Sequence, residues 1–145
     1  MKGSIRFVGH DKRWIPTGNT EGSLEVATWL DNDVVEKNTI TWLIQQFNEF
    51  NFSVKKTNYI CSGNAHHVFS TGEHIFLMCE YADDQKVLLT KEQCLIALEK
   101  YRAFLSSDYK NPSITPEPFE IEYIAEGEEA LAKFTELGGI LKAKR

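Results

Sequence analysis

Residues His74–Tyr81 form the segment that most limits what this chain can fold into. Apolar side chains would occupy both faces of an extended strand here: Ile75, Phe76, Leu77, Met78 and Cys79. Because a strand that is apolar on both faces must be covered on both, it belongs in the middle of a sheet. Turn residues flank it, at Thr71-Gly72 and at Asp83-Asp84-Gln85. We therefore expect antiparallel neighbours at His66–Ser70 and Val87–Leu89.

Three helices are expected where apolar residues recur at helical spacing. The first is capped by Asn38 or Thr39, and its apolar stripe is Ile40, Leu43, Ile44, Phe47 and Phe50. The second has the clearest start, because Thr90 and Gln93 have the spacing of a capping box. Its inner face is Cys94, Ala97, Leu98, Tyr101 and Leu105. The third follows Gly127 and ends at Gly138-Gly139, and its stripe is Ala130, Leu131, Phe134 and Leu137.

The remaining elements complete an α+β pattern. Further strands are expected at Ile5–Val8, Leu24–Leu30, Phe52–Cys61 and Phe119–Ile124. Proline and glycine make Asp11–Gly22 a loop. The expected fold is a mostly antiparallel sheet of about five to six strands packed with about three helices. A length of 145 residues suits a single domain over 1–145, with enough core to need no disulfide.

The overall charge and the cysteines narrow the class of protein. The net charge of −5 disfavours binding to nucleic acid or to anionic lipid, both of which attract basic surfaces. The cysteines Cys61, Cys79 and Cys94 are odd in number and form no CxxC pair. Reduced thiols of this kind favour a cytoplasmic protein. No apolar run has the length of a signal peptide or a transmembrane helix.

Acidic residues are concentrated in three stretches that contain no lysine or arginine. Residues 111–129 hold six carboxylates and contribute −6, so the rest of the chain sums to +1. Glu21, Glu25, Asp31, Asp33 and Glu36 form a second stretch, and Glu73, Glu80, Asp83 and Asp84 a third. If the three meet in space, they give a negative surface that captures a basic protein. The other interpretation is that each is a solvated face that keeps the protein from aggregating.

The expected strand Phe119–Ile124 indicates how part of this acid is presented. Phe119, Ile121 and Tyr123 share one face, which we assign to the core. Glu120 and Glu122 share the opposite face and must reach solvent or a partner. The residues expected to contact a basic partner are Asp83, Asp84, Glu117, Glu120, Glu122 and Glu126.

A metal site or an enzyme is less well supported. The spacing Cys-x4-His-His-x6-His-x4-Cys, from Cys61 to Cys79, uses zinc-binding residue types but matches no standard zinc site. No nucleophile motif, phosphate-binding loop or metalloprotease motif is present. We therefore expect no enzyme, no metal and no cofactor, and place the histidines at turns or edges. The alternatives are a small enzyme or ligand-binding protein that uses His66, His67 or His74, and a subunit of a larger complex.

Trp42 lies off the apolar stripe of the first helix. An exposed tryptophan at that position would be a candidate interaction hot spot, and a second-layer core contact is the alternative.

The C-terminal half resembles one group of small bacterial immunity proteins, which are encoded beside polymorphic toxins such as those of contact-dependent growth inhibition. The resemblance is carried by Val87-Leu88-Leu89-Thr90 with the helix Glu92–Leu105, by Asp108-Tyr109-Lys110-Asn111-Pro112, and by residues 116–130. It covers about Glu73 to Gly139 and leaves the first half uncovered.

This resemblance implies a cytoplasmic inhibitor that is not an enzyme. Its partner would be the C-terminal toxin domain of a large secreted protein, often a nuclease. A nuclease is basic where it holds phosphates, so an acidic inhibitor can occupy the same surface. The implied function is neutralisation of a cognate toxin through the acidic residues named above.

Overall fold

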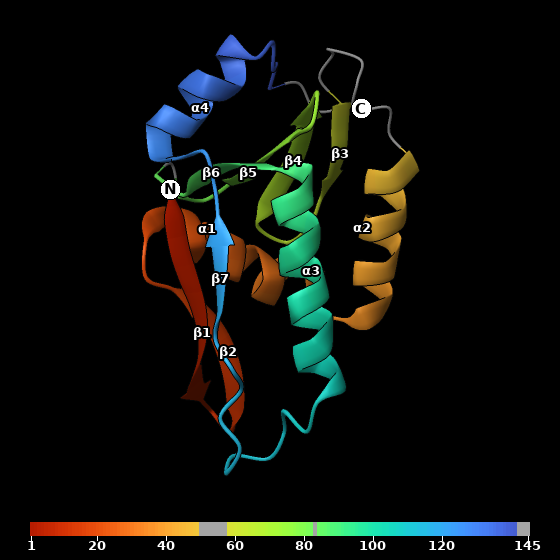
Figure 1. Ribbon diagram of the computed structural model, residues 1–145, viewed down its shortest axis with the longest axis vertical. Coiled ribbons are helices and arrows are strands. Elements are labelled where there is room, and N and C mark those ends of the chain that lie inside the picture. The colour runs from red at the N-terminus through yellow and green to blue at the C-terminus, as the bar shows by residue number, and fades with distance from the viewer. Residues whose placement is uncertain (50–57, 83, 142–145) are drawn as a thin grey trace.

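The computed structural model describes residues 1–49, 58–82 and 84–141, and Figure 1 shows the arrangement of its elements. The N-terminal part consists of β1 (Lys2–His10), β2 (Arg13–Gly18), α1 (Glu21–Trp29), a π-helical turn (Leu30–Val34) and α2 (Lys37–Glu49). The middle part consists of β3 (Asn58–Ser62), β4 (His66–Thr71), β5 (His74–Cys79), β6 (Lys86–Thr90) and α3 (Lys91–Ser106). The C-terminal part consists of β7 (Phe119–Glu122), β8 (Ala125–Glu126) and α4 (Gly127–Glu136).

The α+β fold class is confirmed, and the strands divide into two antiparallel sheets. One sheet has the order β2-β1-β7 and the other the order β3-β4-β5-β6-β8. The expected strand Phe119–Ile124 is shorter, because β7 ends at Glu122. The chain then passes from one sheet to the other: β7 pairs with β1, and β8 pairs with β6. Phe119 and Ile121 are buried while Glu120 and Glu122 are exposed, as the alternation predicts.

The central position of His74–Tyr81 is also confirmed. β5 lies between β4 and β6 and contributes to two hydrophobic cores. Ile75 and Leu77 belong to the main core, which includes residues of α1, α2 and α3. Phe76 belongs to a smaller core on the other face, together with Phe134 of α4. Figure 1 shows α4 on the far side of this sheet from the other helices.

The predicted strand Leu24–Leu30 is wrong, because these residues lie in α1 and the start of the π-helical turn. A capping box starts α1: Thr20 Oγ1 accepts a hydrogen bond from Ser23 N at 3.2 Å, and Ser23 Oγ accepts one from Thr20 N at 2.9 Å. The helix is buried on most of its circumference and contacts both sheets. A helix buried on most sides lacks the polar face that gives a helical period, so its sequence pattern resembles that of a strand.

The predicted loop Asp11–Gly22 is also wrong in part. Asp11 and Lys12, with φ of 47° and 65°, form a two-residue turn that joins β1 to β2. Pro16 lies within β2, where it is tolerated because β2 is an edge strand.

The predicted cap of the first helix is wrong, because α2 begins at Lys37 and Asn38 and Thr39 lie inside it. The described part of the expected strand Phe52–Cys61 is β3, which begins at Asn58; residues 50–57 lie outside the described residues. Thr90 caps α3 by accepting from Gln93 N at 3.1 Å. The Gln93 side chain accepts from Glu122 N at 3.1 Å, so it ties α3 to β7. Within residues 1–49, 58–82 and 84–141, no helix has the length and apolarity to cross a membrane.

Candidate functional site

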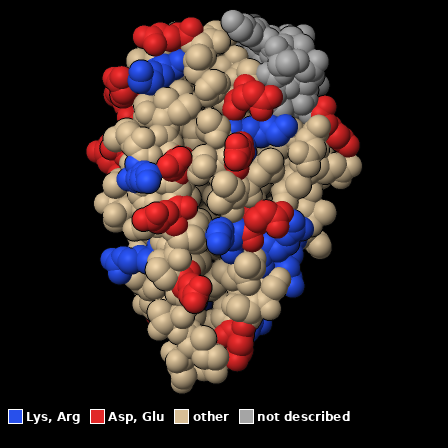
Figure 2. All heavy atoms as spheres, viewed as in Figure 1, with Lys and Arg blue, Asp and Glu red and all other residues tan. Residues whose placement is uncertain are grey.

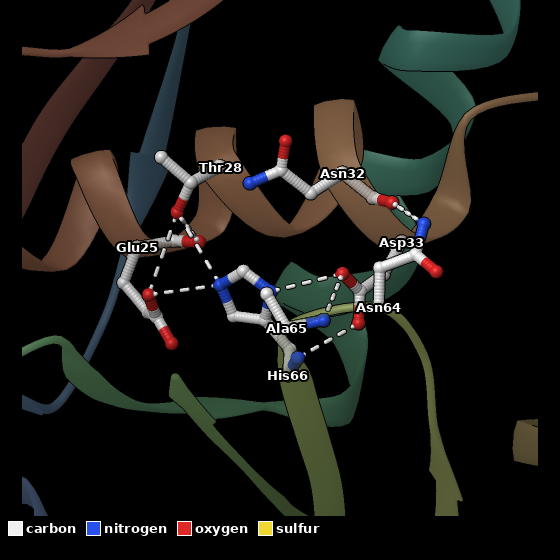
Figure 3. Close-up of polar contacts among 7 residues, drawn as sticks. All are labelled: Glu25, Thr28, Asn32, Asp33, Asn64, Ala65 and His66. Atoms are coloured by element: carbon white, nitrogen blue, oxygen red, sulfur yellow. Dashed lines mark hydrogen bonds and ion pairs between the residues drawn. The ribbon is translucent and has the colours of Figure 1, made fainter. Parts of the chain in front are cut away.

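A buried cluster of three ionisable side chains lies between α1 and the start of β4. His66 Nε2 is 3.2 Å from Glu25 Oε1, and His66 Nδ1 is 3.1 Å from Asp33 Oδ1. The side chains are 1%, 0% and 5% exposed for His66, Glu25 and Asp33. Figure 3 shows the imidazole ring between the two carboxylates, one from α1 and one from the π-helical turn that follows it.

Asp33 also fixes the turn that precedes β4. Its carboxylate accepts from Ala65 N at 3.1 Å and from His66 N at 2.9 Å. Asn64 Nδ2 donates to Asn32 O at 2.9 Å, a second link between the same two segments. Gly63 is needed here because an added Cβ would lie 2.4 Å from Asp33 Oδ2. The cluster therefore pins the β3–β4 turn onto the π-helical turn (Figure 3).

The cluster binds protons more tightly than the unfolded chain does. Burial alone would lower the pKa of His66, but hydrogen bonds and charge from Asp33 and Glu25 outweigh it and raise that pKa to about 9. Burial raises the pKa of Glu25 against the opposing effect of His66. Within the described residues, Glu25 Oε2 has no hydrogen-bond partner, which adds to the cost of ionising Glu25.

The predicted location of the histidines at turns or edges is wrong for His66, which is buried in the main body of the fold. His67 points to the other face of β4, where Nδ1 is 3.0 Å from Tyr59 Oη and Nε2 is 3.8 Å from Glu80 Oε1. His74 lies at the far end of β5, opposite Thr71. The three histidines do not converge, and His66 cannot reach a substrate in this conformation. The geometry does not support an acid–base site built from them.

No group of three or more histidine, cysteine, aspartate or glutamate residues in the described part of the chain is arranged to hold a metal ion. In the buried cluster each ring nitrogen faces a separate carboxylate, so the three side chains share no common point. The cluster is a structural ion network.

Stability is expected to fall as pH rises from 6.5 to 9. A raised histidine pKa means that protonation of His66 stabilises the fold fully below pH 6.5, and this stabilisation is lost as pH passes about 9. The loss amounts to about 3 kcal/mol if the full shift is realised. Protonation of Glu25 also stabilises the fold, because the pKa of Glu25 is raised, and this contribution begins to be lost above the ordinary pKa of 4.5. Urea unfolding at pH 6.5, 7.5 and 9 measures this change.

The matched control for this pH dependence is His66→Asn, whose profile over the same range should lack the part of the decrease that comes from His66. Burial also raises the pKa of the Cys61 and Cys94 thiols, so thiol ionisation in the unfolded chain adds a loss that begins near pH 9 in both proteins. The difference between the wild-type and His66→Asn profiles therefore reports on the cluster. A wild-type midpoint that stays constant or rises over this range would contradict the assignment.

The acidic residues that were expected to contact a partner lie in different places. Glu117, Glu120, Glu122 and Asp84 are exposed. Glu126 is half-buried, and its Oε1 accepts from Gly22 N at 2.8 Å and from Tyr123 Oη at 2.7 Å, so it holds α1 to β8. Asp83 lies outside the described residues.

Two residues of the second acidic stretch do not belong to a solvent-facing surface. Glu25 and Asp33 are buried against His66. The charge count along the sequence therefore overstates the acid available to a partner. On the face shown in Figure 2, lysines and arginines lie among the carboxylates. On β7, Glu122 is 3.7 Å from the Lys2 ammonium group.

One segment of each acidic stretch lies near the start of α4. Gly127 adopts φ of 61°, and a Cβ there would lie 3.3 Å from Glu21 Oε2 and 3.9 Å from the Asp84 carbonyl oxygen. We call this region the acidic corner and define it as Glu21, Asp84, Glu126, Glu128 and Glu129. Two lysines lie beside it: Lys86 Nζ is 2.9 Å from Glu128 Oε1, and Lys133 Nζ is 3.9 Å from Glu129 Oε1.

Trp42 is 44% exposed, which excludes the core interpretation of this residue and leaves it as a candidate hot spot on α2.

Comparison with protein-family models, with curated proteins and with solved structures finds no match to this chain. The resemblance to immunity proteins stays a prediction, and any function has to be argued from the residues themselves.

Proposed function

We propose that this protein is a cytoplasmic immunity protein that binds a basic toxin domain and neutralises it. The observation that carries the proposal is the convergence of the three acidic stretches at the acidic corner. Residues more than one hundred positions apart contribute to it, since Glu126 bonds to Gly22 of α1. Exposed carboxylates gathered from separate segments focus a negative potential that speeds the approach of a basic protein.

Part of this acid also has a folding role. Glu128 and Glu129 lie in the first turn of α4, where carboxylates stabilise the positive end of the helix dipole. Glu21 occupies the same position in α1. Two helix N-termini thus account for three of the carboxylates locally. They do not account for the meeting of these two helix starts with the Asp84 turn.

The geometry of the buried cluster fits a binding function of this protein better than catalysis. His66, the histidine with the raised pKa, is buried and makes hydrogen bonds to Glu25 and Asp33. The exposed acid, in contrast, lies where a macromolecular partner can reach it. An inhibitor needs only such a surface and no reacting groups.

The test of this function is co-expression with the C-terminal domain of the protein encoded immediately upstream. Growth of cells that produce this domain should stop without the immunity protein and resume with it. The two purified proteins should associate, and their affinity should fall as NaCl rises from 50 to 500 mM. Continued growth arrest in the presence of the folded protein would remove the immunity function.

Charge reversal at the acidic corner is expected to slow toxin capture. Asp84→Lys combined with Glu129→Lys should lower the association rate constant about tenfold or more at low salt, because steering depends on local potential. Stopped-flow fluorescence measures this rate, and circular dichroism checks that the variant is folded.

The comparison variant for this prediction is Glu120→Lys with Glu122→Lys on β7, outside the acidic corner. The two pairs are matched, because each contains one carboxylate within 4 Å of a lysine: Glu122 with Lys2 at 3.7 Å and Glu129 with Lys133 at 3.9 Å. We expect a smaller decrease there. If the β7 pair slows association and the corner pair does not, the partner binds the three-stranded sheet and the corner is not the contact.

A further inference from the structure

A cavity open to solvent lies between α3 and the loop that joins α3 to β7. It is separate from the acidic corner. The cavity has a volume of about 350 Å³, which is within the range of pockets that hold small ligands or single side chains. Its walls come from the last turns of α3, from the loop residues Asp108 to Pro118, and from Phe7 of β1. Figure 1 shows this loop at the end of the molecule opposite α4.

The floor of the cavity is aromatic. Phe104 stacks on Phe7 with ring centroids 4.2 Å apart, and Tyr109 packs against Phe104 at 5.1 Å. Phe119 completes the floor, and Ile114 at the rim is 51% exposed. The apolar floor is thus held ready while its rim stays accessible.

The charges around this floor favour a cation. Asp108 and Glu117 both line the cavity, and both are exposed. The carboxyl end of the 16-residue helix α3 also faces this region, and helix carboxyl ends carry partial negative charge.

One cation, Lys100, lines the cavity as well, but it also borders the neighbouring surface beside Glu99. A second cation, Lys110, contacts an aromatic ring of this region. Lys110 Nζ lies 5.9 Å from the centroid of the Tyr109 ring, a cation–π contact.

We propose that this cavity receives a lysine or arginine side chain from the surface of a basic protein partner. The apolar stem would pack on Phe104 and Phe119, and the charged end would lie near Asp108 and Glu117. Long cationic side chains bury their stems on apolar surface in this way. The identity of the partner as a toxin rests on the proposed function, whereas the binding chemistry of the cavity does not.

The test titrates the isotope-labelled full chain with n-butylguanidinium, which carries the stem and head of an arginine. Pentanoate, which has a butyl stem and a negative head, is the matched probe. Butylguanidinium should shift the amide resonances of Phe104, Tyr109 and Ile114, and pentanoate should not. No shifts, or equal shifts with both probes, would overturn the proposal.

Variants at the rim of the cavity test how the charge of each rim residue affects the binding of butylguanidinium. Glu117→Gln and Asp108→Asn should each weaken binding of butylguanidinium about two- to fivefold, as expected for exposed charge pairs. Lys100→Gln should strengthen it by a similar factor. Glu136→Gln, at the end of α4 on the opposite end of the molecule, should change nothing. An unchanged or stronger affinity in Glu117→Gln or in Asp108→Asn would contradict the role assigned to that carboxylate.

The same variants separate this inference from the proposed function. If this protein binds butylguanidinium but neutralises no toxin, the proposal for the cavity stands and the proposed immunity function is wrong. If the toxin dissociates from the double variant D108N/E117Q at the same rate as from the wild type, the cavity does not contact the toxin in that complex.

Discussion

Replacing His66 by alanine is expected to lower the free energy of unfolding by about 3–5 kcal/mol, because it leaves two buried carboxylates without their shared cation. Glu25 and Asp33 would face each other across an unfilled space. Glu25 keeps only its contact to Thr28 Oγ1, at 3.5 Å. Urea unfolding monitored by tryptophan fluorescence measures the loss, and Trp29, which is buried in α1, reports on this part of the fold.

The neighbouring histidine provides the control. His67→Ala removes the same side chain from the next position of β4, where it is partly exposed and pairs with exposed Glu80. We expect it to cost less than about 1 kcal/mol. Equal losses in the two variants would mean that the buried ion network is not what stabilises this region.

A second variant assigns the cost to charge rather than to packing. Glu25→Gln has nearly the same volume and cannot ionise, and burial already raises the pKa of Glu25. It should therefore destabilise the protein much less than His66→Ala does. A loss as large as that of His66→Ala would show that the charge of Glu25 is essential to the cluster.

The sequence predicts the elements whose stability is local. The β4–β5–β6 meander and the start of α3 follow from alternation, turn residues and the Thr90 cap. It does not predict α1, because that helix lies against both sheets and has no polar face to reveal its period. One signal was available: Thr20 and Ser23 have cap spacing, and serine replaces the usual glutamate or glutamine at the third helical position.

The buried cluster is not predictable from spacing alone. His66 lies 41 residues from Glu25 and 33 from Asp33, and only the packing of α1 on the five-stranded sheet brings them together. A charge count along the sequence treats every carboxylate as exposed, and so assigned Glu25 and Asp33 to a surface. The orientation of Glu120 and Glu122 was predictable, because strand alternation depends on neighbouring residues only.

The smaller core is expected to depend on one aromatic ring, so Phe134→Ala should cost about 3–5 kcal/mol. Phe134 is fully buried, stacks on Phe76 with centroids 4.7 Å apart at 10°, and lies 6.2 Å from Phe69. The close approach of Gly139 to this ring is possible only without a side chain, since a Cβ there would lie 2.5 Å from Phe134. Truncation of Phe134 therefore leaves a cavity bordered by Phe76, Phe69 and Gly139.

Because α4 buries little else apart from Ala130, the loss in Phe134→Ala should be concentrated in this helix. Hydrogen exchange should show α4 amides opening far below the global unfolding energy, while the amides of α1 and α3 in the main core stay protected. Leu137→Ala, at the exposed end of the same helix, is the control and should change stability by less than about 1 kcal/mol.

Release of α4 would also separate Glu128 and Glu129 from Glu21 and Asp84, so toxin capture should slow although none of these carboxylates has been changed. If α4 opens in this variant while the association rate stays at the wild-type value, the arrangement of the acidic corner does not contribute to capture.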